Sequence, residues 1–231
     1  MDLAEKLEQE FDLFRSRNRL ISMTSNFIPF PTEDFQKMLD ELLIKGIINQ
    51  QQNFVELGHG IGLNLVIASN YFRNVYGIEL NSHLEKTTTQ IIKKYGNKNS
   101  NIQHVSGNYI TEEFRQLHEE KKTLTSTLWE EDITYRALQK LHKDYTMHGE
   151  DGFKLLDMPM NEFDVFYAFT WGVELPSIIE SIALFGKHGS ILLNATASKF
   201  QDLDEFNQKL DVMRIATINL SRYNIDVYRK S

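Results

Sequence analysis

The chain of 231 residues contains no cysteine. Disulfide bonds, thiolate metal sites and cysteine nucleophiles are therefore excluded, and the absence fits the cytoplasmic location that we expect. Long apolar runs are also missing. Because no segment approaches the length of a membrane span, we expect no membrane partner. The first ten residues are polar and acidic, unlike a signal peptide.

Positive charge is scarce as well. The chain carries 25 Lys and Arg residues against 32 Asp and Glu residues, for a formal net charge of −7. Since an acidic surface repels phosphate backbones, we disfavour nucleic acid as a partner. The adjacent lysine pairs, at 93–94 and 121–122, suit solvated helix faces. The seven histidines form no cluster with carboxylates at metal-ligand spacing, so we expect no metal site.

An alternation of strands and helices begins near residue 53. Hydrophobic residues make up 41% of the chain, which is enough for a substantial core. The pattern predicts strands at 53–57, 75–79, 102–105, 163–167 and 190–195, and helices at about 62–73, 82–95, 111–122, 175–185 and 202–210. Because each of these strands is followed by a helix, neighbouring strands of the sheet should pair in parallel. Two more strands, at about 212–220 and 224–229, are too close together for a parallel crossover and should form an antiparallel hairpin.

Two regions lie outside this alternation. The first 50 residues place apolar side chains on one stripe of a helix from 2 to 17. A second helix is predicted to start at Thr32 as its N-cap and to stop near Gly46. Residues 123–160 contain no clear strand, and we interpret them as a mostly helical insertion. It forms either a lid facing the substrate or a packed embellishment.

The most informative motif spans residues 54–62, which read Phe-Val-Glu-Leu-Gly-His-Gly-Ile-Gly. Gly58, Gly60 and Gly62 let the backbone pass close to a ligand without Cβ clashes, and the free N–H groups of the next helix point to the same place. A dinucleotide fold requires a small residue at position 63, where this chain has Leu63. The acidic Glu56 followed by glycine at every second position resembles motif I of class I S-adenosylmethionine-dependent methyltransferases.

This resemblance implies a site for S-adenosylmethionine at the ends of the first three strands. Glu56 would face the ammonium or sulfonium end of the cofactor, directly or through water. Glu79 and Leu80 are similar to the family's second motif, in which the carboxylate accepts hydrogen bonds from both ribose hydroxyls. Asn108 stands where the family often has an acidic residue, and its carbonyl can accept a bond from the adenine amino group. Tyr109 either covers the adenine or belongs to the core.

The resemblance also implies the architecture. We expect an α/β, Rossmann-like class I methyltransferase fold with a mostly parallel seven-stranded sheet, an antiparallel C-terminal hairpin and helices on both faces. The helical insertion would lie between strands 3 and 4, at about 123–160. Residues 51–231 would form the methyltransferase domain, and the helices of residues 1–50 would cover the cofactor and substrate side.

The substrate is harder to predict. The fourth strand should deliver Tyr167, Thr170 and Trp171 toward the methyl group, but the Asp/Asn-Pro-Pro-aromatic motif of many amino-methylating enzymes is absent. Residues 108–114 and 169–174 are similar to stretches of Dot1-type protein-lysine methyltransferases, although the asparagine pair of that family is missing. No catalytic residue is assigned, because methyl transfer from a sulfonium often needs only proximity and in-line geometry.

Several functions therefore stay open. The leading hypothesis is a methyltransferase that acts on a small molecule. The alternatives are a Dot1-like protein-lysine methyltransferase and a non-catalytic module that binds S-adenosylmethionine. A nicotinamide-dependent oxidoreductase is disfavoured by Leu63. The sequence does not determine the oligomeric state.

Overall fold

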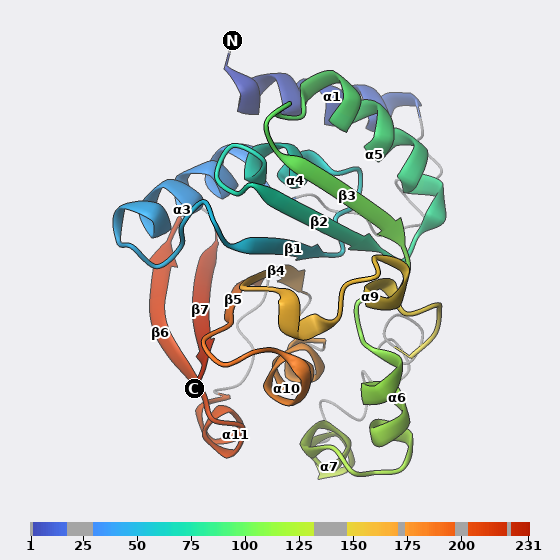
Figure 1. Cartoon of the computed structure of the whole chain (residues 1–231), viewed down its shortest axis with the longest axis vertical. Coiled ribbons are helices and arrows are strands. Elements are labelled where there is room, and N and C mark those ends of the chain that lie inside the picture. The colour runs from blue at the N-terminus through green and yellow to red at the C-terminus, as the bar shows by residue number, and fades with distance from the viewer. Residues whose placement is uncertain (1, 18–29, 132–146, 171–173, 197–202, 221–222) are drawn as a thin grey trace.

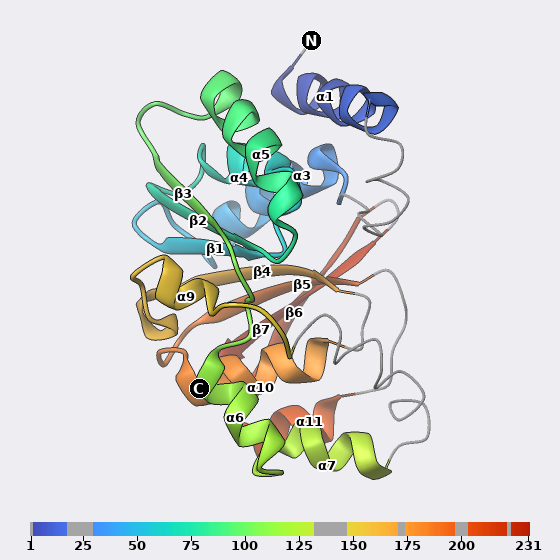
Figure 2. The ribbon, with the colours of Figure 1, turned by 90° about the vertical axis from the view of Figure 1, so that its right-hand side faces the viewer.

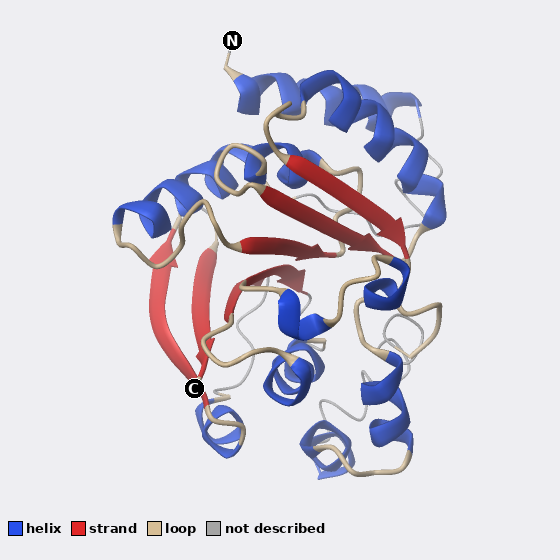
Figure 3. Ribbon diagram, viewed as in Figure 1, coloured by secondary structure: helices blue, strands red, loops and turns tan. Residues whose placement is uncertain are grey.

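A seven-stranded β-sheet forms the centre of the protein and carries helices on both faces (Figures 1 and 3). The computed structural model describes residues 2–17, 30–131, 147–170, 174–196, 203–220 and 223–231. The strands are β1 Asn53–Leu57, β2 Asn74–Glu79, β3 Asn101–Ser106, β4 Val165–Thr170, β5 Ile191–Thr196, β6 Val212–Asn219 and β7 Asn224–Lys230. They lie in the order β3-β2-β1-β4-β5-β7-β6, and only the β5–β7 and β6–β7 pairs are antiparallel. The predicted sheet and its C-terminal hairpin are confirmed.

The helices form two layers (Figure 2). One face of the sheet carries α1 Leu3–Arg17, α3 Thr32–Ile44, α4 Leu63–Ala68 and α5 Ser82–Tyr95. The other carries α6 Glu112–Glu119, α7 Leu124–Glu131, α9 Gly152–Leu155, the 3-10 helix η1 Met160–Glu162, α10 Leu175–Phe185 and α11 Asp204–Lys209. No helix within the described ranges is both long and apolar enough to cross a membrane.

Apolar residues of the strands divide between two cores, because successive strand residues point to opposite faces. On β1, Phe54 packs in the first core, beneath α1, α3, α4 and α5, whereas Val55 packs in the second core, toward α6, α9 and α10. On β4, Val165 joins the first core and Phe166 the second. Strands buried on both faces are typical of a parallel sheet covered by helices.

Local signals explain the helix boundaries that the sequence predicts well. The predicted helices 82–95 and 175–185 match α5 and α10. The Asn81 side chain caps α5 by accepting the N–H of His83 at 3.1 Å. Pro176 lies at the start of α10, where its missing N–H is not needed.

The prediction that Thr32 is an N-cap is wrong. Pro31 occupies that position, and Thr32 is the first residue of α3. The Thr32 side chain instead serves a tertiary contact. Its hydroxyl and its N–H donate to the Glu8 carboxylate at 2.8 and 2.9 Å, and this ties α3 to α1.

Two other boundaries differ from the expectation. The predicted helix 62–73 is shorter, because α4 ends at Ala68 and the chain continues in turns. The fourth strand was expected from residue 163 but begins at Val165. Just before it, the Asp164 side chain accepts the N–H of Asn53 at 2.7 Å. Within the predicted insertion the structure places α7, α9 and η1, and residues 132–146 lie outside the described ranges.

Candidate functional site

The glycine turn follows β1 at the carboxyl edge of the parallel strands. Gly58, Gly60 and Gly62 all have positive φ angles, of 84°, 56° and 79°, a region that favours glycine. The Gly58 N–H donates to the carbonyl of Ile78 at 2.8 Å, which fixes the start of the turn against β2. The Gly60 carbonyl accepts the hydroxyl of Thr88 at 3.1 Å from α5. The turn is therefore held from two sides.

His59 supports this turn from inside the fold. Its Nδ1 lies 3.0 Å from the Gly60 carbonyl, and its ring packs edge-on against His104 with 5.5 Å between centroids. Burial, and then the neighbouring His104, lower the pKa of His59 to about 3. The neutral ring donates from Nδ1. Its position requires Gly77, where an added Cβ would lie 2.6 Å from the ring.

Glu79 ends β2 and faces the glycine turn. Its Oε2 accepts the N–H of Gly60 at 2.9 Å, and its Oε1 accepts the N–H of Asn81 at 2.8 Å. Burial raises the pKa of Glu79, while these backbone donors oppose the shift. A hydrogen bond from the Leu80 backbone has the same effect on the pKa. The backbone thus holds the carboxylate in one orientation.

Glu56 lies beneath the turn and is only 3% exposed. Its Oε1 accepts a bond from the Asn64 side-chain amide at 2.9 Å, and Oε2 has no partner among the described residues. Burial raises the pKa of Glu56 to about 8; the Asn64 bond lowers it and the Glu79 charge raises it. Glu56 and Glu79 therefore lie close enough to interact electrostatically.

Asn108 follows β3 and is fully buried. Its side-chain amide donates to the His148 carbonyl, and its Oδ1 accepts the N–H of Ile110 at 2.7 Å. The predicted bond to adenine would have to share that oxygen. Tyr109 lies beside the glycine turn, with its Cε1 4.0 Å from an ideal Cβ on Gly58. Burial raises the pKa of Tyr109, and the charges of Glu174 and Glu79 add to this effect.

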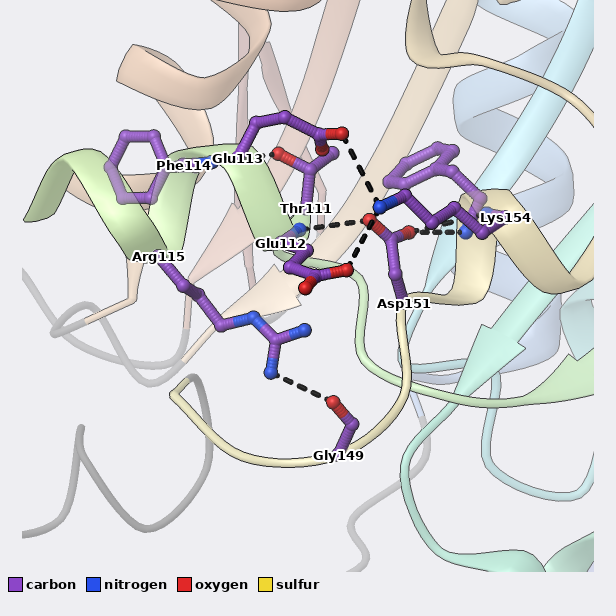
Figure 4. Close-up of polar contacts among 9 residues, drawn as sticks. Thr111, Glu112, Glu113, Phe114, Arg115, Gly149, Asp151 and Lys154 are labelled. Atoms are coloured by element: carbon purple, nitrogen blue, oxygen red, sulfur yellow. Dashed lines mark hydrogen bonds and ion pairs between the residues drawn. The ribbon is translucent and has the colours of Figure 1, made fainter.

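The end of the insertion, residues 147–150, lies beside α6, with Gly149 bonded to Arg115 (Figure 4). Arg115 of α6 donates to the carbonyls of Gly149 and Met147, at 2.7 and 3.4 Å. An added Cβ on Gly149, whose φ is +98°, would lie 2.8 Å from Cδ1 of Leu80 and 3.7 Å from Cβ of Asn108. The returning segment 147–150 thus packs across two residues of the predicted site.

Asp151 fixes the end of this segment. Its Oδ1 accepts the N–H of Phe153 at 2.9 Å and caps α9, while its Oδ2 accepts the N–H of Glu112 at 2.8 Å (Figure 4). One carboxylate therefore serves the N-termini of two helices, where negative charge is favourable. Lys154 adds an exposed ion pair to Glu112 at 2.8 Å.

Of the predicted substrate residues of the fourth strand, Tyr167 lies beside Glu56, its register partner on β1. Tyr167 is fully buried in the middle of β4, and its ring packs against Phe35 at 4.7 Å between centroids. The Thr170 hydroxyl donates to the Asn194 side chain on β5 at 3.1 Å. Trp171 lies outside the described residues. A substrate role for these three residues stays a prediction.

Sequence reasoning missed several residues that build the site. Asn64 is the lone polar residue of α4, which reads Leu-Asn-Leu-Val-Ile-Ala, and such an exception inside a buried helix is a usable signal. Thr88, Arg115 and Gly149 carry no comparable signal, because their contacts cross between segments far apart in the chain.

Comparison with known proteins agrees with this architecture. The family model for "Histone methylation protein DOT1" matches residues 30–125, less than half of the chain. No curated protein matches the sequence significantly. A mutant of MtNAS in complex with S-adenosylmethionine aligns at 12% identity with a TM-score of 0.55, over 99% of this chain and 72% of that chain.

Two methyltransferase structures align similarly. Precorrin-6y C5,15-methyltransferase from Geobacter metallireducens gives a TM-score of 0.51 at 14% identity, over 84% of this chain and 88% of that chain. A SAM-dependent methyltransferase from Aquifex aeolicus gives 0.50 at 12% identity, over 87% and 98%. Structural similarity at such low sequence identity is evidence for the fold alone. The strand order and the antiparallel hairpin of this chain agree with that fold. The chain therefore has the Rossmann-like fold of class I S-adenosylmethionine-dependent methyltransferases.

Proposed function

We propose that the protein is an S-adenosylmethionine-dependent methyltransferase. The observation that supports this proposal most is the arrangement of Glu56 and Glu79 around one glycine turn. Glu79 accepts the N–H of Gly60 within that turn, and the two carboxylates interact electrostatically. Both lie at the carboxyl edge of the parallel strands, where open α/β sheets bind their ligands.

The site residues fit the parts of this cofactor. The two oxygens of Glu79 are fixed by backbone N–H groups beside the glycine turn, and a carboxylate held there suits the neighbouring hydroxyls of a ribose. Glu56 offers a buried oxygen without a protein partner among the described residues, which suits the cationic end. We place the adenine between Leu80 and Tyr109, next to the returning segment 147–150.

The bound cofactor supplies a methyl group on a sulfonium, and the chain's residues hold it and exclude water. In-line placement of an acceptor is then the main requirement for transfer. We place that acceptor beyond Thr170, at the carboxyl end of β4, and propose a small molecule as the substrate. The absence of cysteine favours a cytoplasmic location.

A protein-lysine methyltransferase of Dot1-like type is the second candidate. The family-model match over residues 30–125 favours it, because the match includes the glycine turn, Glu79 and Asn108. The absence of that family's asparagine pair weighs against it. The two residues before the second Dot1-like stretch are Tyr167 and Ala168, and both are buried in β4. A module that binds the cofactor without turnover is the third candidate.

Ligand-induced stabilisation tests the proposal. We expect S-adenosylhomocysteine to raise the melting temperature and NAD to leave it unchanged. At a hundredfold excess over Kd the gain is about 2.7 kcal/mol, or roughly 5–10 °C for a chain of this size. Glu79→Ala should lose most of this shift. Glu205→Ala is the matched control, because Glu205 is an exposed residue of α11 that pairs with Lys209 on the surface.

The outcomes separate the candidates. Stabilisation by NAD, or an unchanged response in Glu79→Ala, would contradict the cofactor assignment. Labelled S-adenosylmethionine then distinguishes the substrates, because transfer into a small-molecule extract supports the first candidate and transfer into lysine-rich protein the second. Tight binding with no transfer into either would leave the non-catalytic module.

A further inference from the structure

A buried amide nitrogen lies near the carboxyl end of β5, on the face of the sheet that carries the second core. Asn194 is 1% exposed, and its Nδ2 has no hydrogen-bond partner within the described part of the chain. Its Oδ1 is already used, because it accepts the hydroxyl of Thr170 at 3.1 Å. The group left over can therefore only donate. A buried donor without an acceptor costs free energy, and native proteins keep few of them.

The strand register places Asn194 beside the cofactor site and outside it. Leu57, the last residue of β1 before the glycine turn, pairs with Ala168 of β4, and Ala168 pairs with Asn194. Neighbouring strands lie about 4.8 Å apart, so Asn194 is about 10 Å across the sheet from the start of the turn. This separation suits a second molecule bound next to the cofactor.

The same face of the sheet is polar beyond Asn194. In the row that contains Asn194, β7 contributes Asp226 and β6 contributes Thr217. The Thr217 hydroxyl donates to Oδ1 of Asp226 at 2.7 Å, and Thr217 is exposed whereas Asp226 is half-buried. Two residues further from the carboxyl edge, Leu192 of β5 and Tyr228 of β7 pack in the second core. The polar row therefore leads from the exposed edge strand to the buried amide.

The charge in this row restricts the chemistry of a ligand. Asn194 requires an acceptor atom, which an anion or a neutral carbonyl group can supply. Side chains directly opposite on neighbouring strands have Cβ atoms about 4.5–5.5 Å apart, so the Asp226 carboxylate would repel an anion bound at Asn194. No ion pair among the described residues includes Asp226. A neutral carbonyl oxygen is therefore the favoured partner.

We propose that Asn194 is a specificity-determining residue for the methyl acceptor and donates a hydrogen bond to a neutral carbonyl oxygen of that molecule, as in an amide, an ester or a ring carbonyl. This inference rests on the proposed function and deepens it by naming the substrate class. Thr170 is a positioning residue, because its hydroxyl orients the amide through Oδ1. The sequence-based prediction differs, since it assigns the contact with the substrate to Thr170 itself.

Methyl transfer at two acceptor concentrations tests the proposal. The probe is a deproteinised cell extract, used dilute and concentrated, with labelled S-adenosylmethionine as the methyl donor. Loss of the donor leaves the substrate carbonyl unpaired, which costs roughly tenfold in affinity. A residue that only recognises the acceptor changes KM rather than kcat. Asn194→Leu should therefore transfer roughly tenfold more slowly in the dilute extract and at nearly the wild-type rate in the concentrated extract.

A second variant and a control separate recognition from packing. Asn194→Ala also removes the donor but empties the position that Asn194→Leu fills, so both variants should show the same loss. Asn101→Leu is the matched control, because Asn101 is an exposed strand residue at the start of β3, on the opposite edge of the sheet. Transfer should be unchanged in that control. The affinity for S-adenosylhomocysteine should be equal in all four proteins, which shows that each one folds.

The outcomes are distinguishable. A loss confined to the dilute extract in both Asn194 variants supports the acceptor role, and equal loss at both concentrations, or none, would overturn it while leaving the proposed function intact. A wild-type product that contains no carbonyl, identified by mass spectrometry of the labelled molecule, would overturn it too. An extract that takes no label from wild type would overturn the small-molecule acceptor and this role together. Failure of wild type to bind S-adenosylhomocysteine would overturn the proposed function itself.

Discussion

At the residue scale, Glu56 combines deep burial with a single hydrogen bond to the residues that the structure describes. Burial raises its pKa from 4.5 to about 8, so the folded protein holds a proton there at neutral pH that the unfolded chain has released. Stability from this residue is therefore fully present below about pH 4.5 and is lost as the pH rises toward 8, at up to about 1.4 kcal/mol per pH unit.

We predict that Glu56→Gln removes this dependence. Glutamine keeps the shape and stays neutral, so the variant should gain stability relative to wild type progressively between pH 5 and 8. The measurement is urea unfolding of both proteins across that range, read as the difference in unfolding free energy. Other groups, including the buried His59, titrate in both proteins and cancel in the difference. A difference that stays constant with pH would show that Glu56 is ionised in the fold.

The same residue shows what sequence reasoning can reach. Spacing alone predicts that Glu56, the three glycines and Glu79 meet, because strand ends of one parallel sheet share an edge. It does not predict that Tyr167 becomes the neighbour of Glu56, since lateral strand order is a tertiary property. Nor does it show that Asn108 is engaged by the His148 and Ile110 backbone.

At the element scale, helices and strands with local signals are predictable and tertiary contacts are not. The cap at Asn81 and Pro176 in α10 mark helix starts in the sequence itself. Thr32 looks like a cap but bonds to Glu8 of another helix, which no local rule includes. The returning segment 147–150 is likewise positioned by contacts to α6 and to Asn108 rather than by its own pattern.

We predict that Arg115 holds this segment in place. In Arg115→Ala the carbonyls of Gly149 and Met147 lose their donor, which costs about 0.5–1.5 kcal/mol locally. The Asn108 and Gly152 amides, which bond to Glu150 and Asn108, should then exchange hydrogen faster by mass spectrometry.

Lys154→Ala is the control for this measurement. Lys154 pairs with Glu112 on the surface, where the two side chains are 55% and 66% exposed, so its loss should change exchange little. Equal acceleration in both variants, or none in Arg115→Ala, would show that the segment is held by packing alone.

At the scale of the whole molecule, one sheet separates two cores, and the carboxyl ends of its central strands carry the candidate site. Charge is the remaining global property, and the net value of −7 opposes a polyanion approaching any large part of the surface. A small cationic cofactor is not repelled by this field, since a net negative charge attracts cations. The global charge therefore bears on the substrate rather than on the cofactor.

We predict that the protein does not bind nucleic acid through its surface charge. A fluorescently labelled 20-base-pair DNA duplex and a single-stranded RNA of equal length should show no anisotropy change up to about 100 µM protein at 0.15 M salt, the weak end of non-specific affinities. Lowering the salt to 0.05 M should produce little binding, because few phosphates could be neutralised by an acidic surface. Micromolar affinity with a steep salt dependence would reveal a local basic surface and would move nucleic acid ahead of small molecules and proteins as the methyl acceptor.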